Sequence, residues 1–91
     1  MNLNLKERRV LVADDSRLVA RSVTTILRNM GIEQIRYAYR PFEILQQCKQ
    51  DYFDLIIYDY NFLSKTNGFQ ILEELQHARC LPATYFRNTK S

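Results

Sequence analysis

An apolar run from Leu55 to Tyr58 that ends in Asp59 is the feature that most constrains the fold of this chain. Because no polar residue interrupts the run, it predicts a strand buried on both faces of a parallel sheet. Such a strand delivers its last residue to the carboxyl edge of the sheet, where open α/β folds bind their ligands. We therefore interpret Asp59 as a carboxylate at a functional site. An aspartate that begins a turn after a strand is the alternative interpretation.

The rest of the chain alternates strand and helix patterns. The helix after the first strand carries apolar residues at helical spacing and ends at Gly31. Its opposite, polar face consists of Arg17, Arg21, Thr24, Thr25 and Arg28. The second helix begins at Pro41, and its inward positions are expected to be Phe42, Leu45 and Cys48. The order β-α-β-α-β-α-β predicts a parallel sheet with right-handed crossovers and helices on both faces. The stripe of the first helix is Val19, Val23, Ile26, Leu27 and Met30, and the expected strands are 9–13, 34–39, 55–59 and 83–86, with a third helix from 69 to about 79.

Length and composition bound the function classes. The chain of 91 residues makes one domain, expected at 9–91 after a disordered or frayed lead-in at 1–8. No apolar run approaches the roughly 20 residues needed to cross a bilayer, and no signal-peptide pattern opens the chain, so we expect a cytoplasmic protein with no membrane partner. The net charge of +3 is spread along the chain without a dense basic block, which makes nucleic-acid binding unlikely.

Acidic residues follow two of the expected strands. Asp14 and Asp15 follow the first, and Asp59 ends the third. Ahead of a helix, an acid at 14 or 15 can also be an N-cap, although a cap hardly needs both. In a doubly wound sheet strands one and three are neighbours, so the three carboxylates converge.

Converging carboxylates need a counter-charge. Two like charges about 4 Å apart repel by roughly 4 kcal/mol at an effective dielectric of about 20. The cluster therefore keeps a proton or holds a hard cation, and Mg²⁺ suits carboxylates together with waters and phosphate oxygens. A metal-neutralised carboxylate can act as a nucleophile towards a phosphoryl donor.

Over roughly residues 8–87 the chain resembles the receiver domains of two-component response regulators. The resemblance implies a flavodoxin-like doubly wound sheet with strand order 2-1-3-4. The stretches that carry it are Val10-Leu11-Val12-Ala13-Asp14-Asp15-Ser16, Asp54-Leu55-Ile56-Ile57-Tyr58-Asp59, Gly68-Phe69-Gln70-Ile71-Leu72 and Leu81-Pro82.

The resemblance also implies roles for individual residues. Asp59 would be the phosphoacceptor and Asp15 a direct Mg²⁺ ligand, with Asp14 holding the metal through water and Asn61 lending its backbone carbonyl. The phosphoryl group would come from a phosphohistidine on a sensor histidine kinase or a histidine phosphotransfer protein. The domain would be a signalling phosphoprotein and not an enzyme, beyond self-catalysed phosphorylation and dephosphorylation of Asp59.

Arg17 and Arg21 stand beside the acidic motif on the first helix. We expect them to form the face on which the phosphoryl-donating partner docks. A solvated charged stripe is the alternative interpretation.

The chain departs from the receiver pattern in three places. Phe62-Leu63-Ser64 replaces the usual Met-Pro after the acceptor, in a loop one residue longer than is common. The position of the Ser or Thr switch residue falls on Arg87, and Thr89 comes two places too late, which leaves the switch residue unknown. The chain also ends before the fifth strand and its lysine.

This incomplete sheet predicts self-association through the uncovered edge of the fourth strand, unless the chain is a fragment of a longer protein. A pseudo-receiver that acts as an unphosphorylated interaction or dimerisation module is a second interpretation. A phosphohydrolase is a third and weaker one, because its Asp-x-Asp motif would need an acid at Asn61.

Overall fold

The computed structural model describes residues 4–59, 70, 73 and 83–87, the last five as a strand. Gln70 and Glu73 are helical. The rest of the helix expected at 69–79, together with Asn61, Thr89 and the loop at Phe62-Leu63-Ser64, lies outside the described residues.

The described strands form a parallel sheet in the order β2-β1-β3-β4. They are β1 (Arg9–Ala13), β2 (Gln34–Ala38), β3 (Leu55–Asp59) and β4 (Ala83–Arg87). β2 and β4 are thus the edges of the described sheet. The order and the parallel pairing confirm the predicted flavodoxin-like doubly wound fold.

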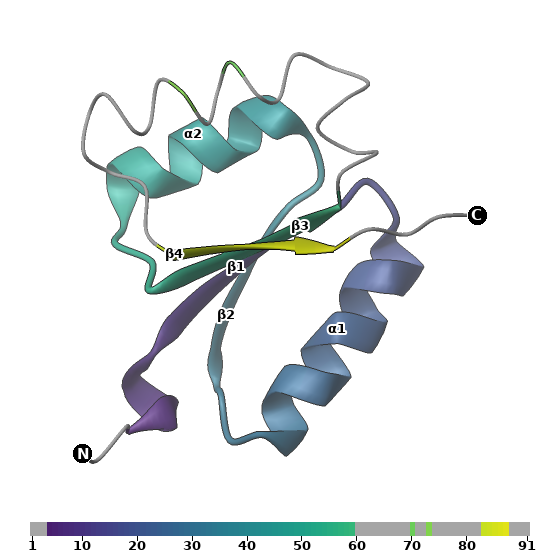
Figure 1. The fold of residues 1–91 in the computed structure, drawn as a ribbon, viewed down its shortest axis with the longest axis vertical. Helices are drawn as coiled ribbons and strands as arrows, with labels where there is room; N and C mark the ends of the chain where they lie inside the picture. Colours follow the sequence, from purple (N-terminus) through teal and green to yellow (C-terminus); the bar gives the residue numbers. More distant parts are fainter. Residues whose placement is uncertain (1–3, 60–69, 71–72, 74–82, 88–91) are drawn as a thin grey trace.

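The two described helices lie on opposite sides of the sheet (Figure 1). They are α1 (Arg17–Asn29) and α2 (Pro41–Gln50). α1 begins at Ser16, whose Oγ accepts a hydrogen bond from the Val19 N–H at 3.3 Å. Neither of these helices has the length and apolar character needed to span a membrane.

Gly31 ends α1 in a conformation that favours glycine. Gly31 has a φ of +98°, a left-handed conformation that a side chain disfavours. The Gly31 N–H donates to the Arg28 carbonyl at 3.0 Å, and the Ile32 N–H donates to the Leu27 carbonyl at 3.0 Å. This pair of bonds satisfies the last carbonyls of the helix as a Schellman motif does.

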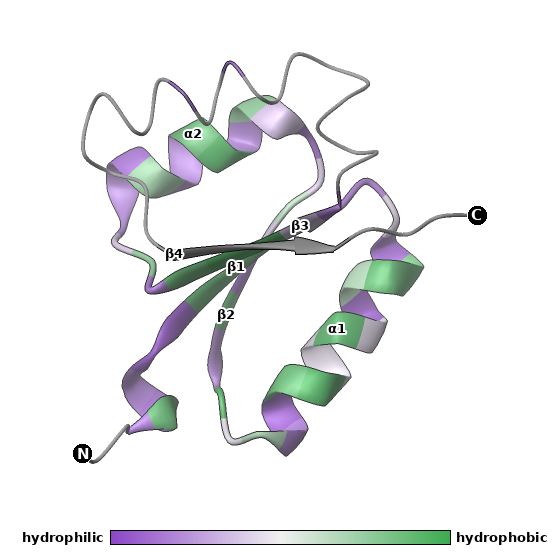
Figure 2. Ribbon diagram, in the orientation of Figure 1, coloured by the Kyte–Doolittle hydropathy of each residue, from purple (hydrophilic) through white to green (hydrophobic). Residues whose placement is uncertain are grey.

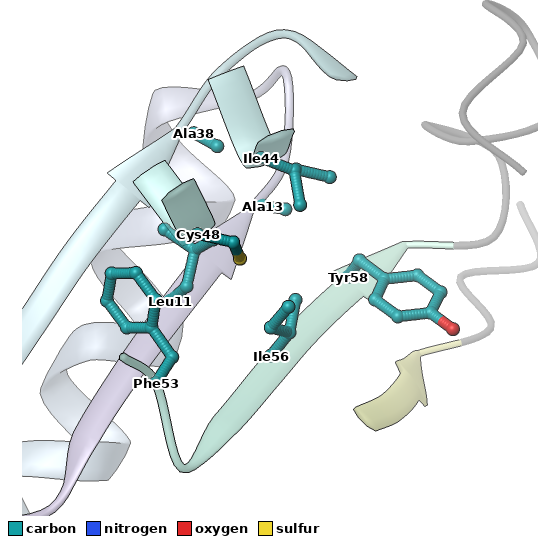
Figure 3. Close-up of a cluster of buried hydrophobic side chains, with 8 residues drawn as sticks. All are labelled: Leu11, Ala13, Ala38, Ile44, Cys48, Phe53, Ile56 and Tyr58. Carbon is teal, nitrogen blue, oxygen red and sulfur yellow. The ribbon is translucent and has the colours of Figure 1, made fainter. Parts of the chain in front are cut away.

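On the α2 side of the sheet, the side chains form a closed apolar core (Figure 3). The prediction that Phe42 faces inward is wrong, because Phe42 is 49% exposed. Ile44 is the fully buried residue in this part of α2. The core consists of Leu11, Ala13, Ala38, Ile44, Cys48, Phe53, Ile56 and Tyr58, with Leu45 packed against it.

On the α1 side the core is more open. Thr24, expected on the polar face of the helix, is buried, whereas Ile26 and Met30 are 60% and 57% exposed. Figure 2 shows apolar (green) stretches distributed along the length of α1. α1 is therefore rotated relative to the predicted stripe. The buried side chains are Val10, Val12, Ala20, Leu27 and Ile32, and those packed against them include Val23, Leu55 and Ile57.

Burial alternates along β3, whereas the sequence predicted a strand buried on both faces. Ile56 and Tyr58, which face the α2 core, are buried, whereas Leu55 and Ile57 on the α1 side are half-buried. The described residues therefore cover one face of β3 more completely than the other.

Residues 1–3 of the lead-in expected at 1–8 lie outside the described residues, and residues 4–8 are described. Leu5–Glu7 form a 3-10 helix, and Leu5 packs against the core on the α1 side. A partly buried leucine holds this segment to the domain.

Candidate functional site

The carboxyl ends of β1 and β3 bring the predicted acids to one edge of the sheet. These strands are parallel neighbours, and Ala13 lies opposite Tyr58. The next residue along each strand, Asp14 and Asp59 respectively, therefore emerges at the same edge. This placement follows from strand order and register.

Asp14 is the buried member of the group. Asp14 is only 4% exposed, whereas Asp15 is exposed and Asp59 is half-buried. The Asp14 backbone N–H donates to the Ala38 carbonyl of β2 at 3.0 Å. Its Oδ1 accepts a hydrogen bond from the Ser16 N–H at 2.9 Å. Both bonds fix Asp14 at the point where β1 passes into α1.

The acids interact electrostatically. Burial raises the pKa of Asp14, and the charges of Asp59 and Asp15 and a hydrogen bond with the Asp15 carboxyl raise it further. The Ser16 N–H, which favours the ionised form, opposes this rise only in part. The surroundings of Asp14 thus disfavour its negative charge, so this edge tends to bind a proton or a cation.

The donor chemistry fits a magnesium ion. Carboxylate oxygens are the ligands that this cation prefers, and a positive charge would offset the burial and the repulsion that together raise the pKa of Asp14. Within the part of the chain that the structure describes, no three acidic, cysteine or histidine side chains are already arranged around one metal position. The predicted contribution of the Asn61 carbonyl falls outside the described residues.

Arg87 stands next to this edge in the sheet. The pairing of β3 with β4 sets Arg87 directly opposite Asp59. The position that sequence reasoning assigned to the switch residue therefore lies beside the proposed acceptor in the neighbouring strand.

Arg17 and Arg21 lie on the flank of α1 that faces β2, where they line an open groove. The Arg17 guanidinium carbon lies 4.1 Å from the centroid of the Tyr39 ring. Sequence reasoning missed the contribution of Tyr37 and Tyr39 to this groove. Tyr37 and Tyr39 are two residues apart, and this spacing indicated that they lie on the same face of the β2 segment. The rotation of α1 that brings Arg17 and Arg21 to this face was not predictable.

A family model for the response regulator receiver domain matches residues 10–85, which is most of the chain. The chain belongs to the response regulator receiver family. A search of curated proteins gave no match. Among solved structures, a MaeR response regulator bound to beryllium trifluoride is similar, with a TM-score of 0.78 and 14% identity, over 92% of this chain and 69% of that one. At this identity the structural likeness supports the fold.

Membership of the receiver family gives the acidic edge a context. Receiver domains are in general signalling domains of two-component systems, and histidine kinases or phosphotransfer proteins are their general class of partner. In this receiver domain Asp14, Asp15 and Asp59 occupy the sheet edge where the doubly wound fold binds ligands.

Proposed function

We propose that this chain is a phosphoacceptor domain that receives a phosphoryl group on Asp59, from a phosphohistidine on a sensor histidine kinase or a histidine phosphotransfer protein, in a Mg²⁺-dependent reaction. The observation that carries the proposal is that Asp14 and Asp59 emerge together at the carboxyl edge of two neighbouring parallel strands. Burial of Asp14, and then the charges of Asp59 and Asp15, raise the pKa of Asp14 there. Acids that repel one another at a ligand-binding edge can together bind a cation, and one of them can then accept a phosphoryl group. Membership of the receiver family supports the same function.

In this mechanism each acid has a separate task. A carboxylate oxygen of Asp59 attacks the phosphorus, a new O–P bond forms, and the N–P bond to the donor histidine breaks with its electron pair left on the imidazole. Asp15, with Asp14 acting through water and the Asn61 carbonyl, would hold the cation. When bound, Mg²⁺ would neutralise the charge of the phosphate as it approaches the carboxylates. The Ser16 N–H keeps Asp14 oriented towards this edge.

The remaining parts of the proposal follow from the same site. The domain acts in the cytoplasm as a phosphoprotein, and its own chemistry is limited to phosphorylation and dephosphorylation of Asp59. Arg87, in register with Asp59, stands where a Ser or Thr switch residue is expected.

The proposal is tested by incubating the chain with Mg²⁺ and acetyl phosphate and recording its intact mass. We expect a gain of one phosphoryl group in the wild type, none in Asp59→Asn, and none when EDTA removes the metal. An equal gain in Asp59→Asn would place the phosphoryl group elsewhere and contradict the assignment of the acceptor.

A pseudo-receiver remains the second candidate, and the register that sets Arg87 beside Asp59 favours it, because a hydroxyl switch is missing at that position. This candidate predicts that the wild type gains no phosphoryl group from acetyl phosphate and does not bind beryllofluoride, a phosphoryl mimic. Under the phosphoacceptor proposal beryllofluoride binds with Mg²⁺ to the wild type and not to Asp59→Asn.

Self-association belongs to the same proposal. β4 is an edge of the described sheet, and an edge strand offers backbone donors and acceptors to a second copy. Sedimentation equilibrium over a hundredfold range of concentration is expected to show a reversible dimer. A monomer at every concentration would contradict pairing through β4.

A further inference from the structure

We propose that the groove between α1 and β2 is the docking site for an acidic segment of the protein that delivers the phosphoryl group, an inference that rests on the proposed function. This α1–β2 groove is open to solvent and has a volume of about 550 Å³. It is lined by Arg17, Leu18, Ala20, Arg21, Tyr37 and Tyr39.

The charge of the groove selects the occupant. Both charged residues in its described lining are arginines, and none of the described lining residues is acidic. A guanidinium presents its N–H groups in a planar fork that matches a carboxylate. Asp or Glu side chains of a partner are therefore the complement of this lining.

The tyrosines are held in place before any partner arrives. The Thr24 hydroxyl donates to the Ala20 carbonyl at 2.8 Å, so its single hydrogen is committed. The 2.7 Å bond between Thr24 and Tyr37 is then donated by the Tyr37 hydroxyl. At the other end, the Tyr39 backbone N–H donates to a Glu43 carboxylate oxygen at 2.8 Å. A groove with fixed walls binds with a smaller loss of conformational entropy.

Arg17 is oriented by the same aromatic wall. Its guanidinium lies over the Tyr39 ring, with 4.1 Å from the guanidinium carbon to the ring centroid. This contact uses the face of the guanidinium and leaves its edge N–H groups for carboxylates.

The same arrangement disfavours nucleic acid as the occupant. The rings of Tyr37 and Tyr39 stack on each other, with centroids 5.9 Å apart and planes 7° from parallel. Arg17 stacks on Tyr39 as well. Nucleic-acid grooves need open ring faces on which bases stack, and here the Tyr39 ring is already in contact with Tyr37 and with Arg17.

The position of the groove ties it to the phosphoryl-transfer site. Arg17 follows Asp15 by two residues, and Tyr39 follows Ala38, whose carbonyl accepts the Asp14 N–H at 3.0 Å. One end of the groove therefore adjoins the edge of the sheet that carries the acids. A partner whose acidic segment lies in the groove is brought close to Asp59.

An apolar residue completes the docking surface. Leu18 lines the groove although its side chain is 73% exposed. An apolar side chain in the partner's acidic segment can cover it and bury apolar area that is now in water.

Binding is tested with a fluorescein-labelled hexaglutamate peptide at low salt. Arg21→Glu is the test variant, and Arg28→Glu is its matched control, because Arg28 is exposed on the same helix but does not line the groove. The two variants change the net charge equally. We expect at least a tenfold loss of peptide affinity in Arg21→Glu and less than a threefold loss in Arg28→Glu. In NMR spectra of the wild type, the Arg17 side-chain N–H and the Tyr39 ring are expected to shift on binding.

Equal losses in both variants would mean that the peptide senses overall charge and would overturn the proposal, as would tighter binding of an oligothymidylate than of the peptide. Intact-mass measurement with acetyl phosphate separates this test from the proposed function. We expect Arg28→Glu to be phosphorylated as the wild type is, because Arg28 does not line the groove. If the wild type binds the peptide but gains no phosphoryl group from acetyl phosphate, the phosphoacceptor proposal is rejected and the groove remains an acidic-peptide site.

Discussion

The two sides of the sheet are built in different ways. On the α2 side, Leu11, Ile44, Phe53, Ile56 and Tyr58 belong to one buried apolar cluster. On the α1 side, fewer side chains are buried, and half-buried ones surround them. The difference shows that one helix is held mainly by burial of apolar surface, whereas the other is held partly by polar contacts.

Polar and charged contacts take over where the α1 side is open. Thr24 is buried there and bonds to Tyr37, and Arg17 stacks on Tyr39. Such groups are weaker sources of stability than buried hydrocarbon, but they can also bind a partner. We infer that stability is concentrated on the α2 side and recognition on the α1 side.

The largest expected effect breaks the α2 side. Ile44→Ala removes a fully buried side chain, and we expect a loss of about 2–5 kcal/mol in the free energy of unfolding. Ile26→Ala in α1 makes the same chemical change at a position that is 60% exposed, and we expect a change within about 0.5 kcal/mol. Urea unfolding of both variants measures the difference. Similar losses in the two variants would contradict the proposed division of the molecule.

A smaller effect of opposite sign is expected at the acidic edge. Asp14→Asn keeps an oxygen for the Ser16 N–H and removes a charge that burial and two neighbouring acids disfavour. We expect this variant to be more stable than the wild type near pH 7, by about 0.5–2 kcal/mol, the usual gain from a single stabilising substitution. Thermal unfolding without Mg²⁺ checks the gain. A lower melting temperature for Asp14→Asn would contradict it.

The same variant gives a pH test. Because the pKa of Asp14 in the folded chain is raised above its unfolded value, the folded state holds the proton more tightly. This stabilising contribution is complete below the unfolded pKa and is lost as the pH rises through the folded pKa. The advantage of Asp14→Asn should therefore grow as the pH rises through that window and shrink at lower pH. Melting curves at successive pH values measure it, and a gap that widens on acidification would refute the argument.

The polar contact on the α1 side is expected to contribute less. In a double-mutant cycle of Thr24→Val and Tyr37→Phe, the coupling free energy should be about 1 kcal/mol, as for an ordinary hydrogen bond. Urea unfolding of the two single variants and the double variant gives this coupling. Additive effects would mean that the bond contributes nothing to stability.

The smallest effect is expected for the contact between Arg17 and Tyr39. Arg17→Lys keeps the charge and weakens the stacking of a planar group on the ring, so we expect a loss of about 0.5 kcal/mol or less in the free energy of unfolding. The signal of the side-chain N–H of Arg17 in NMR spectra provides an independent check, since ring currents of Tyr39 should displace it upfield. An unshifted signal would show that the contact does not persist in solution.

Most of the fold could be predicted because local patterns determine it. The strand at 9–13, the acids that follow it and the end of the first helix at Gly31 each have a local physical cause. The order of the strands followed from the family resemblance and not from the residues. The rotation of α1 was missed because Thr24 and Ile26 were assigned by polarity, whereas packing against Tyr37 decided which of them is buried.

At the candidate site, the convergence of Asp14 and Asp59 was predictable from alternation and strand ends. Phe42 shows the limit of such reasoning, since a large apolar residue in the first turn of a helix need not face the sheet. The aromatic wall of the α1–β2 groove depends on how a helix and an edge strand meet, and this is not visible in either segment alone.

We infer that Asp14, Asp15 and Asp59 act as one electrostatic unit. The most direct test is a pH titration of aspartate carboxyl ¹³C signals by NMR, with the Asp14 signal assigned from Asp14→Asn. We predict that Asp14 titrates above the ordinary aspartate range, that Asp59→Asn lowers its pKa, and that Mg²⁺ lowers it in the wild type. An Asp14 carboxyl that titrates at the ordinary aspartate value and responds to neither Asp59→Asn nor Mg²⁺ would show that the three acids do not act together.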